Sequence, residues 1–116
     1  MSVDKEISLL NFKLEKENDD GNVEYKREII DMEKNENKYG VQMIYRLREG
    51  GGVAYYYLGV NDDGSFYKWD REVRYKSLEN FVKIVKNLKI EIVYILKFNT
   101  GYKIKLFSKE YCNDFI

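Results

Sequence analysis

Cationic and aromatic side chains are interleaved in two stretches of this 116-residue chain, and that combination can do chemistry with nucleic acid. The cations are Arg46, Arg48, Lys68, Arg71, Arg74 and Lys76, and the aromatic residues between them are Tyr67, Trp69 and Tyr75. Arginine and lysine neutralise phosphates, while aromatic rings stack on bases. The pattern therefore indicates contact with RNA, although the aromatic signature of a sequence-specific RNA-recognition motif is absent.

A structural interpretation of the same residues stays open. Arg46 and Arg48 fall in the last turn of a predicted helix, where positive charge complements the negative end of the helix dipole. Most of the 11 tyrosines, Tyr55 to Tyr57 among them, are expected to fill a sheet core.

Catalytic and metal-binding chemistry finds few candidates. The chain has no histidine and one cysteine, Cys112, which excludes histidine-based triads and clusters of Cys or His around zinc. Gly50–Gly52 precede Val53 and lack the Lys-Ser/Thr of a phosphate-binding loop, and no Gly-x-Ser-x-Gly elbow occurs. Asp62 and Asp63 lie in a predicted turn, which favours turn chemistry over metal ligation. We expect a binding protein and not an enzyme, with no cofactor and no metal.

The charge is uneven along the chain although it sums to zero. Residues 1–36 carry 11 acids and 6 bases, whereas residues 37–116 carry 9 acids and 14 bases. We therefore expect an acidic N-terminal arm over residues 1–20 and a single domain over residues 21–116. A single cysteine, no apolar run of membrane-spanning length and no signal-peptide pattern predict a cytoplasmic protein.

Apolar periodicity predicts the elements of that domain. Alternation predicts a strand beginning at Val23, and the helical period predicts helices at 38–49, capped by Asn37, and at 78–88, capped by Ser77. Further strands are expected at 53–60, 65–69, 90–98 and 102–107, with a hairpin turn at 61–64. The strand at 53–60 has apolar residues on both sides, which predicts a doubly covered position. Leu10, Phe12 and Leu14 alternate as in a short strand or an extended docking arm, and one helical turn is the alternative.

These elements predict an α+β fold: the ferredoxin-like βαββαβ plan with an additional C-terminal strand and two helices on one face of an antiparallel sheet. The uncovered face of such a sheet is a common place for RNA or protein contact.

Three consecutive glycines, Gly50 to Gly52, stand out in the stretch Arg46–Gly52, the glycine-rich corner. Glycine costs backbone entropy and buries nothing, so the run indicates positive φ angles or a close approach of the backbone to a partner. One glycine suffices to end a helix, which leaves Gly51 and Gly52 for a contact surface.

Three motifs in order resemble a known family. Asp20–Lys26, Gln42–Tyr56 and Leu58–Gly64 are similar to the N-terminal domain of the GTP-binding protein 1 and 2 family, which comprises translational GTPases related to the elongation factors that deliver aminoacyl-tRNA. The resemblance extends to about Leu88. The GTPase domain itself is missing from these residues, so the resemblance implies a translation setting without GTP binding.

A stand-alone copy of this domain resembles the ribosome dormancy factor of microsporidia. That resemblance implies a hibernation factor bound near the tRNA exit (E) site of the small subunit, where it blocks tRNA passage and contacts ribosomal RNA and ribosomal proteins. The expected contact residues are Asn22, Glu24, Tyr25, Lys26, Arg46, Arg48, Gly50, Gly51, Gly52, Arg71 and Arg74. The alternatives are a protein-binding adaptor that docks through the open sheet or the Leu9–Leu14 arm, a general RNA- or tRNA-binding accessory domain, and a small-molecule-binding regulatory domain.

Overall fold

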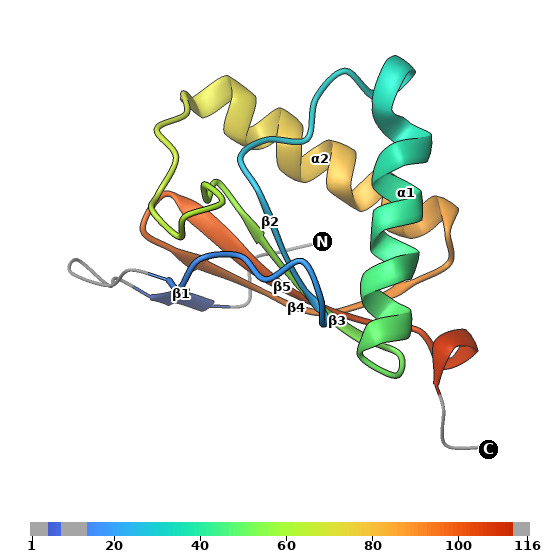
Figure 1. Cartoon of the computed structure of the whole chain (residues 1–116). Helices are drawn as coiled ribbons and strands as arrows, with labels where there is room; N and C mark the ends of the chain where they lie inside the picture. The colour runs from blue at the N-terminus through green and yellow to red at the C-terminus, as the bar shows by residue number, and fades with distance from the viewer. Residues whose placement is uncertain (1–4, 8–13, 113–116) are drawn as a thin grey trace.

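The computed structural model describes residues 5–7 and 14–112. In chain order the elements are β1 (Lys5–Ile7), β2 (Val23–Lys26), α1 (Met32–Glu49), β3 (Val53–Leu58), α2 (Arg71–Asn87), β4 (Glu91–Phe98), β5 (Gly101–Phe107) and a 3₁₀ turn (Lys109–Tyr111). The strands form one sheet in the order β1-β4-β5-β3-β2, and both helices lie on the same side of it (Figure 1). The predicted α+β, ferredoxin-like arrangement of two helices on one sheet is confirmed.

The sheet is mixed, so the prediction of an antiparallel sheet is wrong. β2 runs parallel to β3 and β1 runs parallel to β4, whereas β5 is antiparallel to both β3 and β4. The helix α1 carries the chain back along the sheet, so β3 starts beside β2 in the same direction. The helix α2 then makes a similar crossover from β3 to β4, and β5 inserts between these two strands.

The predicted strand at 65–69 does not form, so the hairpin is absent. Within the described residues this segment has one isolated bridge to the end of β3, between Val60 and Phe66. The physical reason is that both edges of β3 are already occupied, by β2 and by β5. The segment instead crosses toward α2, and the Trp69 indole packs against Gly59 and donates a hydrogen bond to the Thr100 carbonyl at 2.8 Å.

Both helices begin one to two turns before their predicted starts. Asp70 caps α2 by accepting a hydrogen bond from the Val73 amide at 2.9 Å. The predicted cap, Ser77, is buried inside the helix, where its hydroxyl accepts from the Ile29 amide at 3.0 Å. The first two turns of α1 contain mostly exposed polar residues, so no apolar stripe marks them in the sequence.

The hydrophobic core lies between the helices and one face of the sheet. Buried side chains alternate along β3 at Ala54, Tyr56 and Leu58, and the Tyr56 ring packs on Phe81 of α2 at 5.0 Å between centroids. The intervening Tyr55 and Tyr57 are partly exposed on the opposite face. The prediction that β3 is covered on both faces is therefore wrong for the described residues, whose helices all lie on one face.

The segment before β2 crosses the edge of the sheet. The Glu17 amide donates to the Asp62 carbonyl at 2.8 Å, and the Tyr25 hydroxyl donates to the Glu15 carbonyl at 2.7 Å. Of the predicted arm strand, Leu14 is described and has no strand structure, while positions 8–13 lie outside the described residues. In the described part of the chain, neither helix is long and apolar enough to cross a bilayer.

Candidate RNA-binding surfaces

Arg46, the first cation of the glycine-rich corner, points into the protein. Its side chain is 4% exposed, and its Nε donates to the Glu24 carboxylate at 2.8 Å. The terminal nitrogens of its guanidinium donate to the carbonyls of Gly21 at 2.9 Å and Asn18 at 3.1 Å. Two predicted contact residues, Glu24 and Arg46, are therefore joined to each other, and Arg46 fastens the segment before β2 to α1. The expectation that Arg46 meets phosphate conflicts with this buried position.

The close approach predicted for the glycines occurs within the chain. A Cβ at Gly50 would lie 1.9 Å from the Val53 carbonyl oxygen, and the Asn22 side chain donates to that same oxygen at 3.0 Å. Gly51 and Gly52 have positive φ angles of 62° and 103°, which favour glycine. Internal packing and turn geometry account for the run. Arg48 is the exposed cation of this corner, and its guanidinium lies over the Tyr111 ring at 5.5 Å.

A second carboxylate, Glu17, joins the buried charges beside β2. Its Oε2 accepts a hydrogen bond from the Tyr25 amide at 2.5 Å. Burial, followed by the charges of Glu24 and Asp62, raises the pKa of Glu17 from 4.5 to about 7, although the Tyr25 hydrogen bond acts in the opposite direction. The hydrogen bond joins the segment before β2 to the β2 backbone.

Arg71 and Arg74 converge with Tyr75, which the sequence pattern had already indicated, and with Lys97, which it had not. We call Arg71, Arg74, Tyr75 and Lys97 the α2 basic patch. A hydrogen bond from Arg71 and the charges of Arg71, Arg74 and Lys97 lower the pKa of Tyr75, so all three positive charges act on this phenol. The Tyr75 side chain is 56% exposed, and the Arg71 guanidinium lies 5.8 Å from the centre of its ring. Among the described residues, none of these three cations has an ion pair within 4.0 Å.

The uncovered face of the sheet carries a second set of rings and cations. We call Tyr55, Tyr57, Tyr94, Lys103 and Lys105 the tyrosine–lysine face. The register pairs Lys105 with Tyr55 on one side and Tyr94 on the other, and pairs Lys103 with Tyr57. The Lys103 ammonium lies 5.2 Å from the Tyr55 ring centre and 5.7 Å from that of Tyr57.

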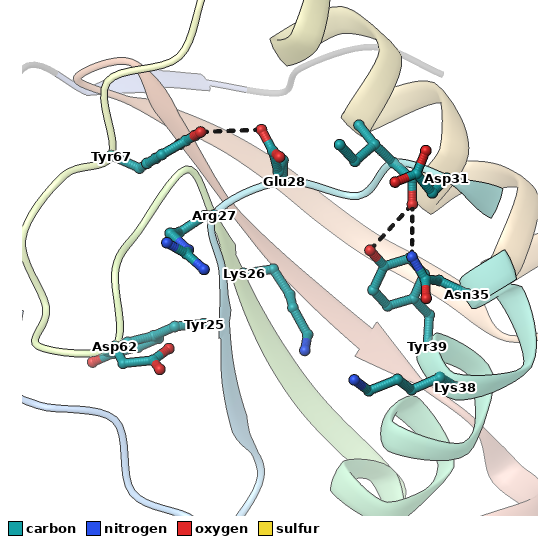
Figure 2. Close-up of a pocket in the computed structure, with 11 residues that line it drawn as sticks. Tyr25, Lys26, Arg27, Glu28, Asp31, Asn35, Lys38, Tyr39, Asp62 and Tyr67 are labelled. Carbon is teal, nitrogen blue, oxygen red and sulfur yellow. Dashed lines mark hydrogen bonds between the residues drawn. The ribbon is translucent and has the colours of Figure 1, made fainter.

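A cleft of about 460 Å³ lies beside the end of β2 and the start of α1 (Figure 2). Lys26, Arg27 and Lys38 line it together with Glu28, Asp31 and Asp62, so its charges balance. The Tyr67 hydroxyl donates to Glu28 at 3.2 Å across the cleft. Tyr25, the remaining predicted residue here, is 7% exposed. The balanced lining gives this cleft no preference for phosphate, and no group of three potential metal ligands occurs among the described residues.

The fold thus separates the predicted contact residues into three places. Asn22, Glu24, Arg46 and the glycines form an internal corner with Arg48 exposed at its surface, Tyr25 and Lys26 border the cleft, where Lys26 also pairs with Glu24 at 3.5 Å, and Arg71 and Arg74 belong to the α2 basic patch. Sequence reasoning omitted Lys97, Lys103, Lys105 and Tyr94 from the site. Along β5, lysines alternate with buried residues, and this pattern could have identified Lys103 and Lys105.

Comparisons with known proteins agree with the resemblance at a coarse level. No protein-family model and no solved structure matches the chain. The chain is 32% identical over 97 residues to an uncharacterised protein of Acanthamoeba polyphaga mimivirus. The aligned region covers 82% of this chain and 52% of that relative. It is 30% identical over 87 residues to GTP-binding protein 2 of Mus musculus and of Homo sapiens, covering 74% of this chain and 14% of those proteins.

The chain therefore spans about half the length of the mimivirus protein and a small part of GTP-binding protein 2. These similarities indicate a distant relation to GTP-binding protein 2. The finer likeness to dormancy factors stays a prediction.

Proposed function

We propose that this protein is an RNA-contacting factor of the translation machinery in the cytoplasm, and more specifically a ribosome dormancy factor. In this proposal it binds the small subunit near the tRNA exit site and blocks tRNA passage by occupying space. It acts by binding, without catalysis and without GTP. The observation that carries the proposal is the α2 basic patch, and the distant relation to GTP-binding protein 2 supports the translation setting.

The electrostatics of the patch favour an anionic partner. Arg71 is the first residue of α2 and Arg74 follows within one turn, where the helix dipole is positive and disfavours cations. Asp70, which caps the helix by accepting from the Val73 amide, and Glu72 offset two of the three positive charges of the patch and leave it with a net positive charge. Phosphate groups of RNA would relieve the remaining repulsion between Arg71, Arg74 and Lys97, and arginine presents paired donors that match a phosphate.

The proposal predicts a salt-dependent complex. Each neutralised phosphate contributes about 0.7–0.9 to the slope of log affinity against log salt. A patch of three cations should therefore give a slope of about two to three. Ribosomal proteins can add contacts that salt weakens less.

Ribosome co-sedimentation tests the patch directly. The variant Arg71→Glu/Arg74→Glu should remain in the light fractions of a sucrose gradient at moderate salt, where the unchanged protein travels with small subunits. The matched control is Lys83→Glu/Lys86→Glu, which reverses two exposed cations on the same helix outside the patch. Undiminished co-sedimentation of the Arg71/Arg74 variant would contradict the assignment of this patch.

A second experiment separates dormancy from general RNA binding. If the protein occupies the exit site, ribosomes saturated with it should lose deacylated tRNA from that site, and translation in a cell-free extract should fall. Retention of exit-site tRNA together with intact ribosome binding would leave an accessory RNA-binding role and remove the dormancy proposal.

The competing function is a protein-binding adaptor. Val41 and Tyr45 lie one turn apart on α1 and are 69% and 41% exposed, which gives a small apolar surface on the helix side. Binding through such a surface should persist as salt rises, whereas binding through the basic patch should weaken steeply.

A further inference from the structure

The uncovered face of the sheet combines rings and cations in a fixed grid. Strand pairing sets Tyr55, Lys105 and Tyr94 in one row across β3, β5 and β4. The next row contains Tyr57, Lys103 and Leu96. Neighbouring strands lie about 4.8 Å apart, so each lysine lies between side chains about 10 Å from one another. Rigid strands, and not loops, therefore position every member of this face.

The lysines of this face are held by rings and not by carboxylates. Lys103 lies over Tyr55 and Tyr57, and Lys105 lies 5.9 Å from the Tyr55 ring centre. Neither lysine takes part in an ion pair within the described residues, whereas Lys76 on α2 pairs with Glu79 at 3.1 Å. Glu91, at the start of β4, is the acidic residue on the same side of the described sheet. The charge of the face is thus net positive.

Other parts of the chain occupy both margins of this face, so a ligand would contact the strands in its middle. On the β2 side, the segment at residues 14–18 covers Tyr25, whose ring packs edge-on against Tyr57 at 5.5 Å between centroids. On the other side, β1 pairs along β4 (Figure 1). Tyr55 and Tyr94 remain partly exposed between these margins, with Lys105 between them.

We propose that the tyrosine–lysine face binds single-stranded RNA, with bases stacked on Tyr55 and Tyr94 and the sugar–phosphate backbone held by Lys103 and Lys105. This inference deepens the proposed function and rests on it in taking RNA as the partner. Lysine–ring contacts at exposed sites are weaker than base stacking on an aromatic residue, so an incoming base can displace an ammonium toward a phosphate. A duplex hides the faces of its bases and cannot use the rings in this way.

Fluorescence anisotropy with a labelled oligouridine of about ten nucleotides, a length within the range bound by single-strand-binding folds, tests the proposal. Tyr55→Leu and Tyr94→Leu keep apolar bulk but remove the ring, and each should weaken binding about tenfold. Lys103→Gln/Lys105→Gln should lower the slope of log affinity against log salt by about 1.4. Tyr45→Leu, which removes an exposed tyrosine from α1, is the matched control and should bind as the unchanged protein does.

Several outcomes would overturn the inference. Equal affinity for a duplex of the same length, or unchanged binding by the ring and lysine variants, would contradict a stacking surface for single strands. If circular dichroism shows that Tyr55→Leu is unfolded, the test rests on the Lys103→Gln/Lys105→Gln variant, because these two side chains lie outside the core. If the unchanged protein co-sediments with ribosomes but does not bind the oligonucleotide, the inference fails while the proposed function stands. Oligonucleotide binding without ribosome binding would support the single-strand surface and remove the ribosomal function.

Discussion

Arginine has opposite roles in two regions of this molecule. Arg46 in the glycine-rich corner is buried, pairs with Glu24 and donates to two backbone carbonyls. Arg71 and Arg74 lie at the start of α2 around an exposed tyrosine and have no ion pair within the described residues. The sequence context of the two sites is similar, since both alternate cations with aromatic or apolar residues. Burial and available partners, and not residue type, separate a structural arginine from one whose guanidinium stays available to a partner.

The largest effect is expected from Arg46→Ala. Removal of the guanidinium leaves the buried Glu24 with one ion-pair partner, Lys26 at 3.5 Å, and takes away the hydrogen bonds to the carbonyls of Asn18 and Gly21, so the free energy of unfolding should fall by about 3 kcal/mol. Urea unfolding followed by circular dichroism measures this loss. Arg48→Ala, two residues away and exposed, should change the free energy of unfolding by less than about 1 kcal/mol. Similar values for the two variants would break the comparison.

The glycine of the same corner gives the next largest effect. In Gly50→Ala the new methyl group would overlap the Val53 carbonyl, and we expect a loss of about 1–3 kcal/mol. Gly21→Ala is a useful counterpart because Gly21 has a φ of 89° but no atom within 4 Å of the position that a Cβ would take, so it reports backbone strain alone. A cost at Gly50 no greater than that at Gly21, measured by urea unfolding, would show that the corner tolerates a side chain.

Glu17 should make the free energy of unfolding depend on pH. Because the folded protein raises the pKa of Glu17 from 4.5 to about 7, it binds more protons than the unfolded chain within that window. The free energy of unfolding should therefore fall as pH rises from about 4.5 to about 7 and should level off above it. Glu17→Gln should flatten this part of the profile, measured by urea unfolding at several pH values.

Glu79 is the control for the pH measurement because its pKa moves the other way. The hydrogen bond and charge of Lys76 lower the pKa of Glu79, so its contribution is present at neutral pH and is lost in acid. Glu79→Gln should leave the slope between pH 4.5 and 7 in place. An unchanged slope in Glu17→Gln would contradict the assignment to Glu17.

The smallest effect on stability is expected at the α2 basic patch. Arg71→Ala/Arg74→Ala should change the free energy of unfolding by no more than about 0.5 kcal/mol, because both side chains reach the surface and oppose the helix dipole. The same variant should lose ribosome co-sedimentation. A strongly destabilised double variant would place these arginines in the same structural class as Arg46.

Sequence patterns predicted the parts of the fold where one side of an element is buried. Alternation located β3 and β5 to within two residues, and the helical period located the buried half of α2. The first turns of both helices were missed because their residues face water and leave no apolar stripe. The strand at 65–69 was predicted from local residues alone. A strand also needs a free edge to pair with, and both edges of β3 are paired, one with β2 and one with β5.

The site was harder to predict than the fold. Nothing local marks Arg46 as buried, because its partner Glu24 lies 22 residues earlier on another element. Tyr55, Tyr56 and Tyr57 are identical in type, and only the pleat of β3 assigns the middle ring to the core and its neighbours to the open face. Lys97 lies on β4 and Arg71 at the start of α2. The crossover through α2 brings them into one patch, and no short sequence motif indicates this.

The packing of Trp69 has a practical consequence. It is the single tryptophan of the chain, its indole is fixed against Gly59 and Thr100, and it stands two residues before Arg71. The Tyr67 ring lies 6.3 Å from it. The intrinsic fluorescence of the protein therefore comes from one defined position beside the α2 basic patch. Titration with an unlabelled anion can therefore be followed by tryptophan emission at that position. The same emission reports unfolding of the connection between β3 and α2, separately from the circular dichroism of the whole fold.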